Sequence, residues 1–213
     1  MDRNRFRLLF DRCKSPKATI VADRLFNELD RRYGEAHRRY HTGAHIAHCL
    51  QQMDSAAAVL GKNDAVEMAI WFHDAIWDPK ASDNEYRSAE LFKSRVSDVA
   101  SKAFIDAVYR LIMITVHPSS PQMDDEKFLV DIDLSSFGMP WDAFSRDSAL
   151  VREEFAHLSD DEFGRNHCIF LRSLLDRESI FTTEYYRERY EETARANMRR
   201  QLTELGNHCT GSV

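Results

Sequence analysis

Apolar side chains recur along the chain at the three- and four-residue spacing that is typical of an amphipathic α-helix. Capping residues, glycines and prolines mark where these stretches begin and end. Thr42 can cap a helix that Gly61 ends, and Ser159 stands three residues before Glu162, the spacing of a capping box. The pattern therefore predicts helices over residues 42–60, 64–77, 83–96, 102–116, 159–177 and 183–205.

Evidence for β-structure is weak along the whole chain. The apolar segment 128–137 is short, and we interpret it as a helical turn or a buried connector. With 7 Gly and 5 Pro among 213 residues, the chain has few of the turns that an all-β fold needs. We expect an all-α fold and a single domain over residues 1–213.

Composition and charge narrow the class of protein. The 43% of hydrophobic and 30% of charged residues are typical of a folded chain and argue against intrinsic disorder. A net charge of −6 gives no support to a general nucleic-acid-binding protein. No apolar run is long enough for a signal peptide or a membrane span. We therefore expect a soluble, cytoplasmic protein with no membrane partner, and the helix-rich surface is compatible with a homodimer.

The four cysteines stand far apart, at positions 13, 49, 168 and 209, and none belongs to a C-x-x-C motif. A chain with this many core residues does not need a disulfide framework. We therefore expect free thiols in a reducing compartment.

Histidine and aspartate gather in otherwise apolar surroundings. His41, His45 and His48 are spaced so that a helix brings them onto roughly one face. The dipeptide His73-Asp74 lies within AIWFHDAIW, the most apolar stretch of the chain. Burying an unpaired imidazole and carboxylate there would cost several kcal/mol, so both are expected to be paired or bound to a metal.

A third apolar segment adds two aspartates, Asp131 and Asp133. A single histidine on an amphipathic helix is most often solvated or packed in the core, and this interpretation applies to His48, His157, His167 and His208. The combination of a helical histidine, a buried His-Asp pair and a buried aspartate is less common, and it indicates a metal site.

The order His45, His73-Asp74, Asp133 resembles the H…HD…D motif of the HD-domain superfamily of metal-dependent phosphohydrolases. The blocks RRYHTGAHI, AIWFHDAIWD, DNEYRSAEL and DIDLSSFG resemble a subgroup of small bacterial proteins, the predicted HD-superfamily hydrolases. The segment ARANMRRQLTEL is similar to that subgroup's C-terminus. The resemblance implies an HD-like core over about residues 38–138 and a helical extension over about 142–205.

The resemblance further implies one divalent transition-metal ion, with His45, His73, Asp74 and Asp133 as its ligands. Asp133 is preferred to Asp131 because it begins an Asp-Leu-Ser sequence, as in the family's phosphodiesterases. Two imidazoles and two carboxylates suit Mn²⁺, Fe²⁺, Co²⁺, Ni²⁺ or Zn²⁺. The implied reaction is hydrolysis of a phosphate ester or anhydride of a small metabolite, nucleotides included, by metal-activated water.

Such a reaction needs a group that orients or deprotonates the water. Asp78 is one candidate, since a continuous helix would place it one turn beyond Asp74, and Glu85 is the other. Trp77 stands where the family's nucleotidases carry a glutamate, and this departure weakens the match to them.

Substrate contacts are expected from His41, Arg38 and His117. Two other functions stay open on the same scaffold. One is a non-catalytic module that binds metal or nucleotide, which the departure at Trp77 favours. The other is a dinuclear iron oxygenase, for which His117 and His41 would have to supply further ligands.

Overall fold

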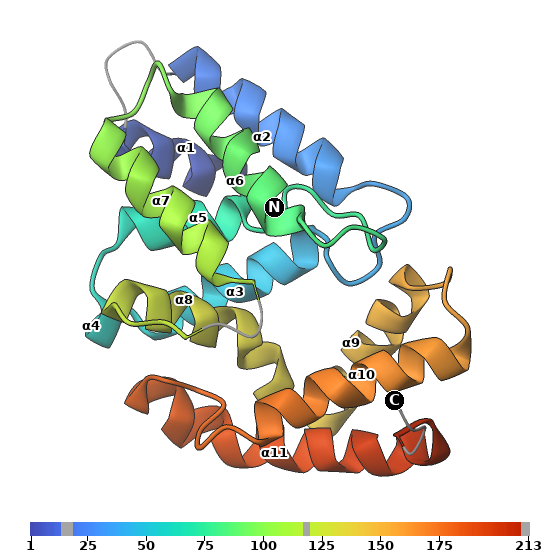
Figure 1. Ribbon diagram of the computed structural model, residues 1–213. Helices are drawn as coiled ribbons and strands as arrows, with labels where there is room; N and C mark the ends of the chain where they lie inside the picture. Colours follow the sequence, from blue (N-terminus) through green and yellow to red (C-terminus); the bar gives the residue numbers. More distant parts are fainter. Residues whose placement is uncertain (14–18, 117–119, 210–213) are drawn as a thin grey trace. The chain divides into compact units, whose positions relative to one another are not determined.

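The computed structural model describes residues 1–13, 19–116 and 120–209, and within these ranges the chain forms helices and no strand (Figure 1). The expected all-α class is confirmed. None of the described helices is both long enough and apolar enough to cross a membrane. The α-helices are α1 (Arg3–Cys13), α2 (Thr19–Tyr33), α3 (Gly43–Ser55), α4 (Ala57–Leu60), α5 (Asp64–Phe72), α6 (Asn84–Val96), α7 (Lys102–Ile114), α8 (Asp124–Leu134), α9 (Trp141–Glu154), α10 (Asp160–Leu175) and α11 (Glu184–Leu205). Two short 3-10 helices are η1 (Ser135–Gly138) and η2 (Gly206–Cys209).

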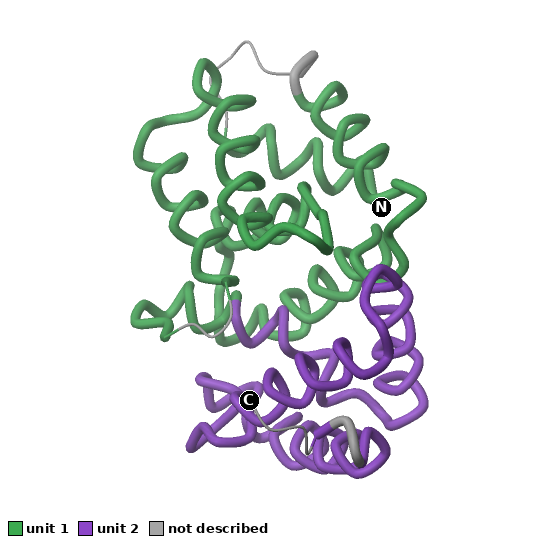
Figure 2. Tube along the Cα trace, turned by 45° about the vertical axis from the view of Figure 1, so that its right-hand side comes forward, with its two compact units in different colours: residues 1–129 green, residues 130–213 purple. Residues whose placement is uncertain are grey.

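The chain divides into two compact units, residues 1–129 and 130–213 (Figure 2). The first unit holds α1 to α7 and the beginning of α8. The second holds the end of α8, η1, α9 to α11 and η2. The expectation of a single domain, with an HD-like core and a C-terminal extension, stays a prediction.

Helix α5 forms the centre of the first unit. All its residues from 66 to 72 are buried, as expected for a helix that is apolar on every face. It packs against α1, α3, α6 and α7. Glu67 lies within this buried stretch, and its carboxylate is paired with Arg5 and Arg12 of α1, at 2.7 and 2.9 Å. This packing fixes the end of α5, where the His-Asp pair follows.

The predicted helix over 64–77 is too long, because α5 ends five residues earlier. The next residues form turns whose backbone is bonded by side chains of α6. Ser88 Oγ accepts a hydrogen bond from Ile76 N at 2.9 Å, and Asn84 Oδ1 accepts one from Asp78 N at 3.0 Å. These bonds satisfy backbone groups that a longer helix would pair internally.

The predicted helix starts are confirmed where a cap marks them. The side chain of Thr42 caps α3, and Ser159 and Glu162 form the capping box of α10. Gly61 ends α4 with a φ of 69°, although the predicted helix over 42–60 is interrupted at Ala56 and becomes α3 and α4. The ambiguous segment 128–137 is helical, as part of α8 and η1.

A disulfide joins two of the four cysteines. Cys168 of α10 and Cys209 of η2 are bonded, with Cα atoms 5.5 Å apart. The expectation of free thiols is therefore wrong for this pair and confirmed for Cys13 and Cys49. Because 41 residues separate the bonded cysteines, their spacing does not reveal that η2 packs against α10.

Candidate metal centre

Three side chains of the first unit converge at the end of α5. His45 comes from the first turn of α3, while His73 and Asp74 follow α5 directly, and all three are buried. His73 Nε2 lies 3.2 Å from His45 Nε2 and 3.2 Å from Asp74 Oδ2. His45 Nε2 and Asp74 Oδ2 are 3.5 Å apart. The predicted His45, His73 and Asp74 are thus brought together as one cluster.

The spacing of the three donor atoms fits a metal ion. Two ligand atoms that are each about 2.1 Å from one ion lie about 3.0 Å apart at octahedral angles and about 3.4 Å apart at tetrahedral angles. The measured separations of 3.2, 3.2 and 3.5 Å are close to these values. Two imidazole nitrogens and one carboxylate oxygen are also donors that divalent transition metals accept. The cluster can therefore hold such an ion.

Hydrogen bonding orients the ring of His73 for this role. Its Nδ1 lies 3.0 Å from the carbonyl oxygen of Ile70 on α5. A carbonyl only accepts, so Nδ1 carries a proton and Nε2, which faces His45 and Asp74, is the nitrogen that can coordinate an ion once its own proton is released. A backbone carbonyl bonded to the far nitrogen is the usual support of a metal-binding histidine.

The electrostatics of the cluster favour an ionised carboxylate. Burial raises the pKa of Asp74, but the charge of His73 and its hydrogen bond, with smaller contributions from His41 and His45, outweigh burial and lower that pKa. Asp74 is therefore held as an anion beside two imidazoles. A divalent ion would replace the positive charge that these rings supply.

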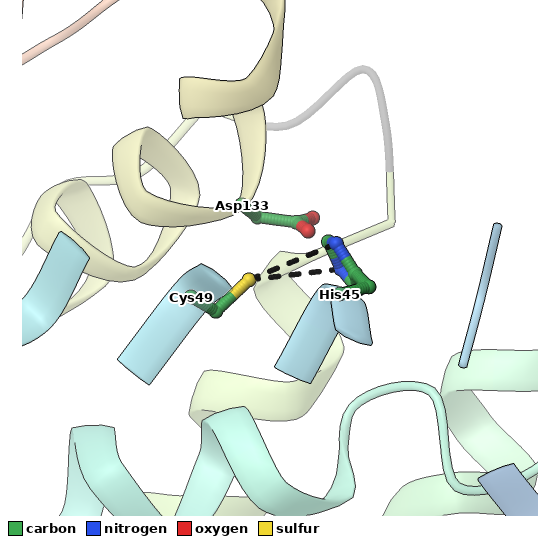
Figure 3. A group of neighbouring side chains, drawn as sticks. All are labelled: His45, Cys49 and Asp133. Atoms are coloured by element: carbon green, nitrogen blue, oxygen red, sulfur yellow. Dashed lines mark hydrogen bonds between the residues drawn. The ribbon is translucent and has the colours of Figure 1, made fainter. Parts of the chain in front are cut away.

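Cys49 also contacts the cluster, although the sequence patterns did not point to it. It follows His45 by one turn of α3, and its Sγ is 3.7 Å from His45 Nε2 and 3.9 Å from Nδ1 (Figure 3). The thiol is buried. The spacing of four residues was the signal that could have found it.

Arg38 lies beneath the turn that carries Asp74. Its guanidinium donates to three backbone carbonyl oxygens: Nη1 to His41 at 2.9 Å and to Asp74 at 2.8 Å, and Nη2 to Ala75 at 3.1 Å. The side chain is fully buried. Its expected contact with substrate stays a prediction; in the structure three backbone carbonyls, the Glu35 carboxylate and the ring of Tyr33 surround the guanidinium.

His41 lies against Trp77 rather than among the three donors. The two rings are stacked, with centroids 3.6 Å apart, and the His41 and His45 rings are 6.0 Å apart. On the same turn, His37 Nε2 donates to the carbonyl oxygen of Trp77 at 2.8 Å. Trp77 is thus held by two histidines, His41 through its ring and His37 through its carbonyl oxygen.

Asp78 and Glu85, the two candidates for water activation, lie on different elements. Because α5 ends early, Asp78 is not one helical turn beyond Asp74, and its Oδ1 accepts a hydrogen bond from Lys80 N at 3.0 Å. Glu85 is in the first turn of α6 and is half-buried. Either role stays a prediction.

A cavity of about 560 Å³ opens beside Asp78 and Trp77. It carries both signs of charge along its wall. Its lining consists of Arg32, Glu35, His37, Ile76, Trp77, Asp78, Pro79, Lys80 and Arg87. An open pocket of this size has room for a small metabolite.

The two aspartates of α8 differ in their surroundings. Asp131 is buried, and its carboxylate accepts four hydrogen bonds, two each from Thr182 and Thr183, at 2.7 to 3.1 Å. Asp133, also labelled in Figure 3, is half-buried on the same helix. Asp133 belongs to the second unit, and its role as a ligand stays a prediction. His117 lies outside the described residues.

Comparison of the chain with known proteins finds no matching family, no similar curated protein and no similar solved structure. The residues themselves therefore carry the functional argument. They establish a helical protein with a buried cluster of histidine and aspartate that can hold a metal ion.

Proposed function

We propose that this chain is a metal-dependent phosphohydrolase of the HD superfamily, which hydrolyses a phosphate ester or anhydride of a small metabolite. The observation that carries the proposal is the cluster of His45, His73 and Asp74, with donor atoms 3.2 to 3.5 Å apart in the order that the family motif requires. Asp133 is the proposed fourth ligand.

The ion would be Mn²⁺, Fe²⁺, Co²⁺, Ni²⁺ or Zn²⁺, since each accepts a mixed set of imidazole and carboxylate ligands. When bound, it supplies activation of a water molecule and neutralisation of negative charge on a phosphoryl oxygen. The protein contributes a site from which bulk water is largely excluded, because His45, His73 and Asp74 are all buried. In such a site the electrostatic effect of each group is stronger than in water.

The cavity beside Trp77 is the proposed place for the body of the substrate. Arg32, Lys80 and Arg87 line it and can attract an anionic metabolite. Asp78 lines the same cavity and is the proposed acid-base group, with Glu85 as the alternative.

One observation favours a second candidate function. Trp77 replaces a glutamate of the family's nucleotidases, and its ring is occupied by stacking on His41. A chain that keeps the metal ligands but lacks an acid in this place could bind metal and a phosphorylated ligand without turnover.

The test measures metal content and phosphate release on the same protein samples. Wild type and His73→Ala are compared after reconstitution with Mn²⁺, Co²⁺, Ni²⁺ or Zn²⁺ and are then given a panel of nucleotides and phosphate esters. We expect close to one ion per wild-type chain, phosphate release by wild type alone, and loss of both in the variant. Metal binding without phosphate release for any substrate would favour the binding module. A wild type that takes up no metal would contradict both functions.

A further inference from the structure

Arg38 stands out among the arginines of the first unit because its charged group is entirely enclosed. The exposed fraction of its side chain is 0%, whereas the next residue, Arg39, is exposed. Burying a guanidinium costs several kcal/mol unless its donors are satisfied. Here they are: three backbone carbonyls accept from Nη1 and Nη2, and Glu35 Oε2 lies 3.2 Å from Nε.

The three carbonyls that Arg38 binds belong to the two segments that carry the metal-site residues. One belongs to His41, two residues before α3, the helix whose first turn carries His45. The other two belong to Asp74 and to Ala75, so Arg38 binds the backbone of a proposed metal ligand directly. One side chain therefore joins the two segments that supply the three donors.

The backbone carbonyls just after α5 need hydrogen-bond donors from elsewhere in the chain. Helix α5 ends at Phe72, so the carbonyls that follow have no helical N–H to accept from. The ring of Tyr33 lies under the guanidinium, 5.2 Å from its centre, and the Tyr33 hydroxyl donates to Trp71 O at 3.0 Å. Tyr33 and Arg38 together bind the carbonyls of Trp71, Asp74 and Ala75, in the last turn of α5 and just after it.

A lysine cannot replace this function. The planar guanidinium presents several N–H donors in fixed directions, and Nη1 alone serves His41 and Asp74 at once. A lysine ammonium would keep the charge but would reach fewer of the carbonyls at suitable angles. Replacing Arg38 by lysine therefore keeps the positive charge and removes the fixed directions of the hydrogen bonds.

We infer that Arg38 is a positioning residue of the metal centre: it locks the turn of His73 and Asp74 to the loop before α3, so that the three donor atoms meet at metal-ligand spacing. The inference rests on the proposed function, since it requires that the cluster bind a metal. It differs from the expectation that Arg38 contacts substrate, because its effect is exerted through backbone carbonyls.

The experiment compares the affinity for Co²⁺ of wild type, Arg38→Lys and Arg39→Lys, each by titration of the metal-free protein. Loss of the groups that support metal ligands typically weakens binding about 10- to 100-fold, and we expect a loss of that size for Arg38→Lys. Arg39→Lys makes the same chemical change on the exposed neighbour and should bind Co²⁺ as wild type does. Binding of inorganic phosphate to the cobalt-loaded proteins is measured in parallel.

Each outcome decides a different point. Wild-type Co²⁺ affinity in a folded Arg38→Lys overturns the inference, and weaker phosphate binding with unchanged Co²⁺ affinity assigns Arg38 to the substrate instead. If Arg38→Lys does not fold, Glu35→Ala takes its place; it removes the acceptor of Nε together with the carboxylate oxygen 3.8 Å from His37 Nε2. Weaker Co²⁺ binding then supports the inference, and unchanged binding overturns it. A wild type that binds no Co²⁺ or other divalent metal overturns the proposed function and, with it, the role of Arg38.

Discussion

Asp74 and Asp131 are both buried aspartates, one in each unit, yet their neighbours differ in kind. Asp74 faces the ring nitrogens of His45 and His73, which are themselves metal-binding atoms. Asp131 faces two hydroxyls and two backbone N–H groups of residues 182–183, and all four donate hydrogen bonds to it. The same residue type is thus set up for coordination in one place and for structure in the other.

The difference shows that burial of a carboxylate does not by itself indicate a metal site. What distinguishes the two is the kind of neighbour: imidazole nitrogens, which divalent transition metals bind well, surround Asp74, whereas hydroxyl and N–H groups that already donate to the carboxylate surround Asp131. Around Asp74 the two imidazoles can release their protons and coordinate together with it. Around Asp131 both oxygens are already used, and one of the donating residues, Thr183, is the N-cap of α11. Asp131 therefore anchors the start of the last long helix.

The largest expected effect is a difference in bound metal between a variant of Asp74 and a variant of Asp131. Asp74→Asn removes the anionic ligand and should reduce the bound metal from close to one ion per chain to near zero, because an amide is a much poorer ligand than a carboxylate. Asp131→Asn should leave the bound metal unchanged. Elemental analysis of both variants beside wild type measures this directly.

The folding of both variants has to be checked by circular dichroism, so that loss of metal is not loss of structure. Equal metal loss in two folded variants would mean that Asp131 belongs to the centre, and the contrast drawn between the aspartates would be wrong.

Much of the fold could be predicted from local patterns. Thr42, Ser159 and Thr183 carry side chains that cap helices, and each marks a helix start that the structure confirms. The end of α5 could not be predicted, because it depends on hydrogen bonds from Ser88 and Asn84, which come from another helix. The interruption of the predicted helix over 42–60 at Ala56 likewise has no marker in the sequence.

In the candidate site, too, some features could be predicted from the sequence and others depend on contacts that form only on folding. The residue types and order of His45, His73 and Asp74 pointed to a shared cluster, and the structure brings their donor atoms together. The surroundings of Arg38 were not predictable, since only the folded turn reveals that its partners are carbonyls rather than solvent or ligand. Cys168 and Cys209 are bonded for a comparable reason, the packing of η2 against α10.

The second prediction concerns stability and the structural role of Asp131. Asp131→Ala leaves four donors of Thr182 and Thr183 without their acceptor, two of them backbone N–H groups at the start of α11. We expect the free energy of unfolding to fall by about 3 kcal/mol, since four half-buried donors each lose a hydrogen bond whose net contribution is on the order of 0.5 to 1 kcal/mol. Thr182→Val removes a single hydroxyl donor and should cost about 1 kcal/mol. Urea unfolding measures both, and similar losses in the two variants would show that the carboxylate is not the common anchor.

The smallest expected effect concerns how the contributions of Asp131 and Asp74 to the free energy of unfolding change with pH. The two contributions should change in opposite directions. Burial raises the pKa of Asp131 above its usual 3.8, and the hydrogen bonds from Thr183 and Thr182 offset this only in part. A raised pKa means that the folded chain holds the proton more tightly than the unfolded chain. The contribution of this group is therefore complete below pH 3.8 and is lost as the pH rises through the folded-state pKa.

Asp74 should behave in the opposite way in metal-free protein. Its pKa is lowered despite burial, by the charge and hydrogen bond of His73, so its contribution is present above pH 3.8 and is lost as the pH falls below that value. The free energy of unfolding of wild type relative to Asp131→Asn should therefore decline with rising pH, whereas relative to Asp74→Asn it should increase. Slopes of the same sign would show that folding shifts the pKa values of both carboxylates in the same direction, and the distinction between a coordinating and an anchoring aspartate would then lose this support.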